Sequence, residues 1–143
     1  MRCIIHIGTE KTGTSLLQEW LYKNIQNLRA NGIYLTQKFD FPNNRYFPAY
    51  FNTEPDDFLL EHKLNSLKER DEFLSSFIFD FEAELQHAKD CNTLIITSEH
   101  FHSRLNQPKE IAALKRFLDA YFNKIEIVCY FREQSEMALS SYS

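Results

Sequence analysis

The residues best suited to chemistry lie near the start of the chain, in a short loop after an apolar run. The run, residues 3–7 (CIIHI), predicts a buried strand, and Gly8 and Gly13 bound the loop that follows it. The chain has only three glycines, so two of them in one loop indicate a backbone that must turn tightly. When a strand is followed by a glycine-containing loop and then a helix, the backbone N–H groups of the loop and of the first helical turn can point toward a bound anion. The candidate anion-binding residues are Lys11, Thr12, Gly13, Thr14 and Ser15.

The spacing of this loop is close to that of nucleoside-triphosphate-binding loops and departs from it at one position. The pattern G-x-x-x-x-G-K-[ST] fits Gly8 and Gly13, but Thr14 stands where the lysine belongs. The lysine is instead inside the loop, at Lys11, and Ser15 stands at the place of the magnesium-binding hydroxyl. A loop with one cation inside it suits an anion that needs less neutralisation than a magnesium triphosphate. A phosphosulfate is one such anion.

A second candidate anion site lies near the end of the sequence. Residues 125–131 (IEIVCYF) predict another strand, Arg132 follows it directly, and Ser140 comes eight residues later. An arginine offers a planar, bidentate fork to a phosphate, and the serine adds a hydroxyl donor where the intervening chain bends back. The alternative is an ordinary surface, with Arg132 paired to Glu133 or Glu136 and the serine exposed on a helix.

Two titratable side chains follow a central apolar run. Residues 92–97 (NTLIIT) show no alternation and predict a strand that is buried on both faces of a parallel sheet. Glu99 and His100 come just after its carboxyl end. Because ligands bind beyond the carboxyl ends of strands in open α/β sheets, we expect both side chains at the same edge as Lys11.

Either of these side chains could accept a proton from a substrate. Glu99 is the first candidate for the base, His100 the second and His102 the third. A carboxylate needs burial to raise its pKa toward neutrality. The alternative for Glu99 is that it caps the loop or pairs with Arg104, and His6, inside the first strand, is predicted to be a core histidine with satisfied polar atoms.

The two anion-binding motifs, in this order and each after a predicted strand, resemble those of sulfotransferases that use 3′-phosphoadenosine 5′-phosphosulfate (PAPS). Residues 11–15 (KTGTS) are similar to the family's 5′-phosphosulfate loop, and Arg132 with Ser140 is similar to its 3′-phosphate motif. The resemblance implies in-line transfer of a sulfuryl group from PAPS to a hydroxyl or amine. It also implies that Lys11 stabilises the charge on the bridging oxygen, that Glu99 or His100 is the base, and that no metal is needed.

The sequence departs from the family in two respects. Gln134 stands where many members have a proline. Members are also about twice as long, and their C-terminal portion carries a glycine-rich, basic loop over the adenosine that has no counterpart here. The resemblance therefore implies that residues 1–143, a single domain, are the N-terminal part of such an enzyme. We expect such a part to bind the donor weakly or not to turn over.

Two other functions stay open. A small-molecule kinase with a nucleotide-binding P-loop would need a lysine at position 14 and an acid at a strand end, and Glu99 offers only the second. A non-catalytic module that kept the nucleotide-binding fold is the other possibility. Loss of transfer in Glu99→Ala, with donor binding intact, would distinguish an enzyme from a binding module.

Around these motifs the sequence predicts an α/β domain of the P-loop type, with a parallel sheet between two helical layers. Helices are predicted over residues 14–30, over residues 56–89 in one or two pieces, and over residues 108–121, with a strand over residues 33–35. Residues 36–55 hold three of the four prolines and many aromatics, which predicts either a hydrophobic cover or a wall for the acceptor. A last helix is predicted over residues 133–143.

Composition limits the partners. A net charge of −4 without a basic run argues against nucleic-acid binding. No apolar run approaches the ~20 residues of a membrane span, and no leader precedes the first strand, so we expect a cytoplasmic protein. Its acceptor would be a small molecule or a carbohydrate, and nothing in the sequence specifies an oligomeric state. The three cysteines lack metal-ligand spacing and are predicted to be reduced thiols: Cys3, Cys91 and Cys129.

Overall fold

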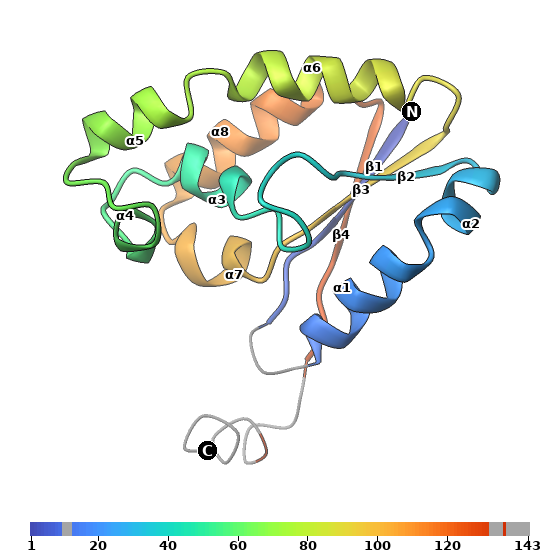
Figure 1. Cartoon of the computed structure of the whole chain (residues 1–143), viewed down its shortest axis with the longest axis horizontal. Coiled ribbons are helices and arrows are strands. Elements are labelled where there is room, and N and C mark those ends of the chain that lie inside the picture. Colours follow the sequence, from blue (N-terminus) through green and yellow to red (C-terminus); the bar gives the residue numbers. More distant parts are fainter. Residues whose placement is uncertain (10–12, 132–135, 137–143) are drawn as a thin grey trace.

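The computed structural model describes residues 1–9, 13–131 and 136. Within them, parallel strands form one four-stranded sheet in the order β2-β3-β1-β4, which confirms the predicted α/β class and parallel sheet. Figure 1 shows β1 and β3 at the centre of the sheet. The strands are β1 (Arg2–His6), β2 (Ile33–Leu35), β3 (Thr93–Thr97) and β4 (Lys124–Val128).

Helices cover both faces of the sheet (Figure 1). One face carries α1 (Thr14–Lys23) and α2 (Ile25–Ala30). The other side holds α3 (Tyr46–Phe51), α4 (Asp57–Glu61), α5 (Leu67–Phe73), α6 (Phe77–His87), α7 (His100–Arg104) and α8 (Pro108–Asp119). Within the described segments, no helix is both long and apolar enough to cross a bilayer.

The pleat of the central strands supplies an apolar core to each face. Alternate side chains of a strand project to opposite sides. Ile95 therefore packs with Leu21 of α1, whereas Leu94 and Ile96 join the larger aromatic cluster on the other side. Every residue of β3 is buried, as its unbroken apolar run predicts.

The aromatic segment 36–55 contributes mainly to the core. Phe39 and Phe47 lie edge-to-face with ring centroids 4.8 Å apart, and Phe47 is 5.0 Å from Phe77 of α6. All three rings are buried. The predicted hydrophobic cover is therefore confirmed for these rings. The same segment sends polar side chains, Asn43 and Asn44, to the end of β3.

The structure divides the predicted helices more finely. The helix predicted over residues 14–30 breaks at Asn24, whose side-chain amide donates to the Trp20 carbonyl at 2.7 Å and so competes with the helical backbone. The segment 56–89 forms α4, α5 and α6, because Asp56 and Ser66 each cap a new start. The short α7 was not predicted. The helix predicted over residues 133–143 lies outside the described residues except for position 136.

The three cysteines are free thiols, as predicted. Cys3 and Cys91 are buried and Cys129 is partly buried. Burial raises the pKa of the Cys3 thiol to about 12, so this side chain acts as a small apolar core residue.

Candidate functional site

The candidate site lies at the carboxyl ends of the two central strands, β1 and β3. The chain leaves β1 toward α1 on one face of the sheet, and it leaves β3 toward α7 and α8 on the other (Figure 1). Adjacent strands whose connections diverge in this way leave a crevice between them. Open α/β sheets bind their ligands in such a crevice.

A direct contact joins the first loop region to the end of β3. Thr14, the first residue of α1, donates a hydrogen bond from Oγ1 to Oε2 of Glu99 at 2.5 Å. Thr14 is buried and Glu99 is half-buried. This contact places Glu99 beside the start of α1, whereas Lys11 lies outside the described residues. Arg104, the alternative partner considered for Glu99, donates two hydrogen bonds to Asp57.

The N-terminus of α1 is shaped for close approach by a ligand. Gly13 precedes the helix with a φ of 83°, a conformation that strains residues with a Cβ. Glycine has no side chain, so Gly13 makes no side-chain hydrogen bond to the first N–H groups of α1. Backbone N–H groups of an uncapped first turn are available to an anion, and the helix dipole favours negative charge there.

A buried polar chain lies beneath Thr14 and Glu99. Gln18 of α1 donates through Nε2 to Thr97 Oγ1 and to Asn43 Oδ1, each at 3.4 Å. Ser98 Oγ donates to the same Asn43 oxygen at 3.2 Å, and His6 Nδ1 lies 2.8 Å from Thr97 Oγ1. The chain therefore ties α1, β1, β3 and the aromatic segment together under the crevice.

Sequence reasoning missed Gln18 and Asn43, because neither belongs to a motif. A signal was nevertheless present for Gln18. It follows Thr14 by four residues and precedes Leu21 by three, so these three side chains share one helix face. That face is the buried one in α1. A polar side chain on the inward face of a helix indicates a buried hydrogen-bond network.

His6 differs from the expectation of a fully satisfied core histidine. Its Nδ1 is paired with Thr97, but its Nε2 is buried without a hydrogen-bond partner in the described part of the chain. Burial lowers the pKa of His6, and the nearby charge of Glu99 opposes this only in part. The ring is therefore neutral near pH 7.

His100, the second candidate base, begins α7 and is half-buried. Its pKa is lowered first by burial and then by the positive charges of Arg45 and Arg104, while Glu99 and Asp57 act in the opposite direction. A neutral imidazole can accept a proton, so His100 remains chemically competent beside Glu99.

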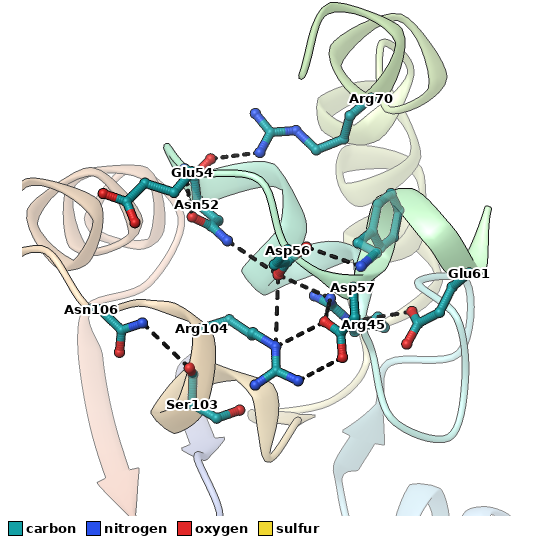
Figure 2. A network of polar contacts seen from close by, with 11 residues as sticks. Arg45, Asn52, Glu54, Asp56, Asp57, Glu61, Arg70, Ser103, Arg104 and Asn106 are labelled. Carbon is teal, nitrogen blue, oxygen red and sulfur yellow. Dashed lines mark hydrogen bonds and ion pairs between the residues drawn. The ribbon is translucent and has the colours of Figure 1, made fainter. Parts of the chain in front are cut away.

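An ion-pair network behind the site holds α7 in place (Figure 2). The Arg45 guanidinium donates from Nη2 to Asp56 at 3.0 Å and to Asp57 at 2.9 Å. Arg104, the last residue of α7, donates two hydrogen bonds to the Asp57 carboxylate, at 2.9 and 2.6 Å. Because Arg104 anchors one end of α7, the network positions His100 at the other end.

The network predicts a loss of stability in acid. The hydrogen bond from Arg104 is the main cause that lowers the pKa of Asp57 from 3.8 to about 2. The unfolded chain therefore takes up this proton at a higher pH than the folded one, so the contribution of Asp57 is complete above about pH 5 and is lost as pH falls toward 2. We expect Asp57→Asn to be less stable than the wild type at pH 6 and to lose less stability on acidification.

Urea denaturation at pH 6 and pH 3 measures this difference. Asp90→Asn is the matched control, because Asp90 is an exposed carboxylate that also faces an arginine. The prediction would be contradicted if Asp57→Asn lost as much free energy of unfolding between pH 6 and pH 3 as the wild type does.

Of the predicted site residues, the structure describes Gly13, Thr14, Ser15, Glu99 and His100, and it brings Thr14 and Glu99 into contact. The others lie outside the described residues: Lys11, Thr12, Arg132 and Ser140. A comparison of the sequence with protein-family models and with curated proteins finds no match. The functional conclusion therefore depends on the residues and their geometry.

Proposed function

We propose that this domain binds PAPS and transfers its sulfuryl group to a hydroxyl or amine of a small-molecule or carbohydrate acceptor. The observation that carries the proposal is the hydrogen bond between Thr14 and Glu99. It joins the helix start that follows the anion-binding loop to a carboxylate able to take a proton. A donor site and a base in one crevice are the minimum that this reaction requires.

The donor would be held at two points. Backbone N–H groups of residues 12–15 and the N-terminus of α1 receive the 5′-phosphate, and the Thr14 and Ser15 hydroxyls add donors. Lys11 stabilises the negative charge that develops on the bridging oxygen. Arg132 and Ser140 bind the 3′-phosphate and so orient the sulfuryl group. This donor site belongs to the P-loop type of α/β fold that we propose for the domain.

Transfer then proceeds by one displacement. The acceptor oxygen or nitrogen forms a bond to sulfur while the bond from sulfur to the bridging phosphate oxygen breaks. The acceptor proton passes to Glu99, and adenosine 3′,5′-bisphosphate leaves. The hydrogen bond from Thr14 to Oε2 holds the Glu99 carboxylate in place beside the start of α1. His100 is the second candidate for the proton acceptor.

The setting of the enzyme is also part of the proposal. Free, largely buried thiols fit a reducing compartment such as the cytoplasm. The two phosphate-binding motifs fit the N-terminal part of a longer sulfotransferase, in which a later segment covers the adenosine.

Calorimetric titration with adenosine 3′,5′-bisphosphate tests the donor site. We expect binding that does not depend on Mg²⁺ and that weakens by about 10- to 100-fold in Lys11→Ala and in Arg132→Ala, because each removes a charged partner of a phosphate. Lys68→Ala is the control, since this lysine is exposed on α5. A Mg²⁺-dependent preference for ADP would favour a kinase and overturn the proposal.

A further inference from the structure

His6 lies at the carboxyl end of the central strand β1, directly before the candidate anion-binding loop. It is the last residue of β1, two positions before Gly8, and its side chain is only 3% exposed. The ring lies between Thr97 of β3, which it contacts at 2.8 Å, and Tyr130, which follows β4. The ring therefore contacts a residue of β3 and a residue of the segment after β4, the strands on the two sides of β1, at the point where the chain leaves β1 for the anion-binding loop.

The polar chain beneath the site includes one ring nitrogen of His6, Nδ1, and leaves the other, Nε2, outside it. The Gln18 amide nitrogen can only donate, so Thr97 Oγ1 accepts from it. Thr97 then has one hydroxyl proton to give, and His6 Nδ1 is the acceptor that lies within reach of it. The Thr97 oxygen has two lone pairs, so the 2.8 Å contact fits either tautomer of His6; we assign the tautomer in which Thr97 donates to Nδ1 and the single proton of the neutral ring is at Nε2.

This Nε2–H group has no acceptor in the described part of the chain. The atom is buried and makes no hydrogen bond. Its aromatic neighbour, Tyr130, meets the ring edge-to-face with centroids 5.5 Å apart, a contact that is much weaker than a hydrogen bond. Buried donors without acceptors are rare in native proteins, and an ordered water or a bound ligand commonly supplies the missing partner.

We propose that His6 is a ligand-binding residue, whose Nε2–H donates a hydrogen bond to an anionic oxygen of the group held in the loop. The inference rests on the proposed function and deepens it, because the group would be the 5′-phosphosulfate of the donor. A neutral donor at this position binds an oxyanion without adding charge to the buried layer. In the assigned tautomer Thr97 donates to Nδ1, which leaves Nε2–H as the available donor.

A pair of substitutions separates the two ring nitrogens. The side-chain amide of His6→Gln reaches the position of Nε2, whereas that of His6→Asn reaches only the position of Nδ1. With adenosine 3′,5′-bisphosphate as the probe, we expect His6→Asn to weaken binding by about 10- to 100-fold and His6→Gln by less than about 3-fold. His87→Asn, an exposed histidine at the end of α6, should bind as the wild type does.

The outcomes distinguish the two proposals. Wild-type affinity in His6→Asn would overturn the role of His6 and leave the donor site intact. Absence of binding in the wild-type protein would remove the proposed function, and the role of His6 with it. Thermal melts of each variant show whether an affected variant is still folded at the titration temperature.

A second measurement does not depend on any substitution. In a long-range ¹H–¹⁵N spectrum of the wild-type protein, we expect His6 as the Nε2–H tautomer and a change in its Nε2 and Hε2 shifts when the bisphosphate is added. An Nδ1–H tautomer, or a His6 signal unchanged at saturation, would overturn the inference even if both variants unfold.

Discussion

Arg45→Ala should lower the free energy of unfolding by about 3–5 kcal/mol, the usual effect of removing one partner from a buried ion pair. The Arg45 side chain is 2% exposed and its Nη2 holds both Asp56 and Asp57. Arg104 keeps its bidentate pair with Asp57 and lies 3.8 Å from Asp56. Asp56, which is 13% exposed, therefore loses its closest cation and keeps only this longer ion pair and the hydrogen bond from Asn52. Its charge would remain in a poorly solvated place.

Arg29→Ala provides the control for this prediction. Arg29 forms a hydrogen-bonded pair with Asp90 at 3.0 Å, but the two side chains are 43% and 62% exposed. An exposed pair of this kind contributes about 0–1 kcal/mol. Urea denaturation of both variants at pH 7 gives the comparison, and equal losses would show that the buried position of Arg45 has no special energetic role.

The same network connects stability to the site. Arg45 and Arg104 meet at Asp57, and Arg104 terminates α7, whose first residue follows Glu99 directly (Figure 2). We therefore expect the loss of Arg45 to disturb the position of Glu99 as well as the stability of the fold.

Glu99→Gln should reduce sulfuryl transfer by about 10²- to 10⁴-fold, the range that a positioned general base contributes. Glutamine keeps the size of the side chain and an oxygen that can accept from Thr14, so the crevice should keep its shape. Donor affinity should stay within about 3-fold of the wild type, because only the proton acceptor is lost. The measurement is acceptor-dependent release of adenosine 3′,5′-bisphosphate, with phenols, sugars and amines as acceptors.

Two further variants identify the base. His100→Gln tests the second candidate, and His102→Gln is the control, since His102 is exposed on the same short helix. A large loss in His100→Gln with near-normal transfer in Glu99→Gln would move the role of base to His100. Near-normal transfer in both would remove the end of β3 from the proton transfer.

Much of the architecture is local in origin and was therefore predictable. The strands are short apolar runs between polar segments, and β2 matches its predicted residues 33–35, while β1 lies one position from its prediction. The glycine at position 13 marks the left-handed turn before α1. Such features depend on neighbouring residues, so the amino-acid order was enough to place them.

The helix breaks were harder to predict, because they depend on single side chains that compete with the backbone. Asn24 ends α1 with a hydrogen bond to Trp20, and Ser66 starts α5 by accepting from Glu69. In a pattern of apolar residues these positions look like ordinary polar surface. The periodicity of residues 56–89 therefore indicated helix correctly, in one or two pieces, but not the division into α4, α5 and α6.

The candidate site also has a part that could be predicted from the sequence and a part that depends on the tertiary structure. The candidate residues Thr14 and Glu99 could be chosen from their types and their places after apolar strands. Their contact, across 85 positions of sequence, exists because β1 pairs with β3 in a register that sets His6 beside Thr97. The buried polar chain from Gln18 to His6 and the pairing of Arg45 with Asp56 and Asp57 also depend on this packing. Local sequence determines which segments form strands and helices, but burial and long-range pairing decide which polar side chains meet away from water.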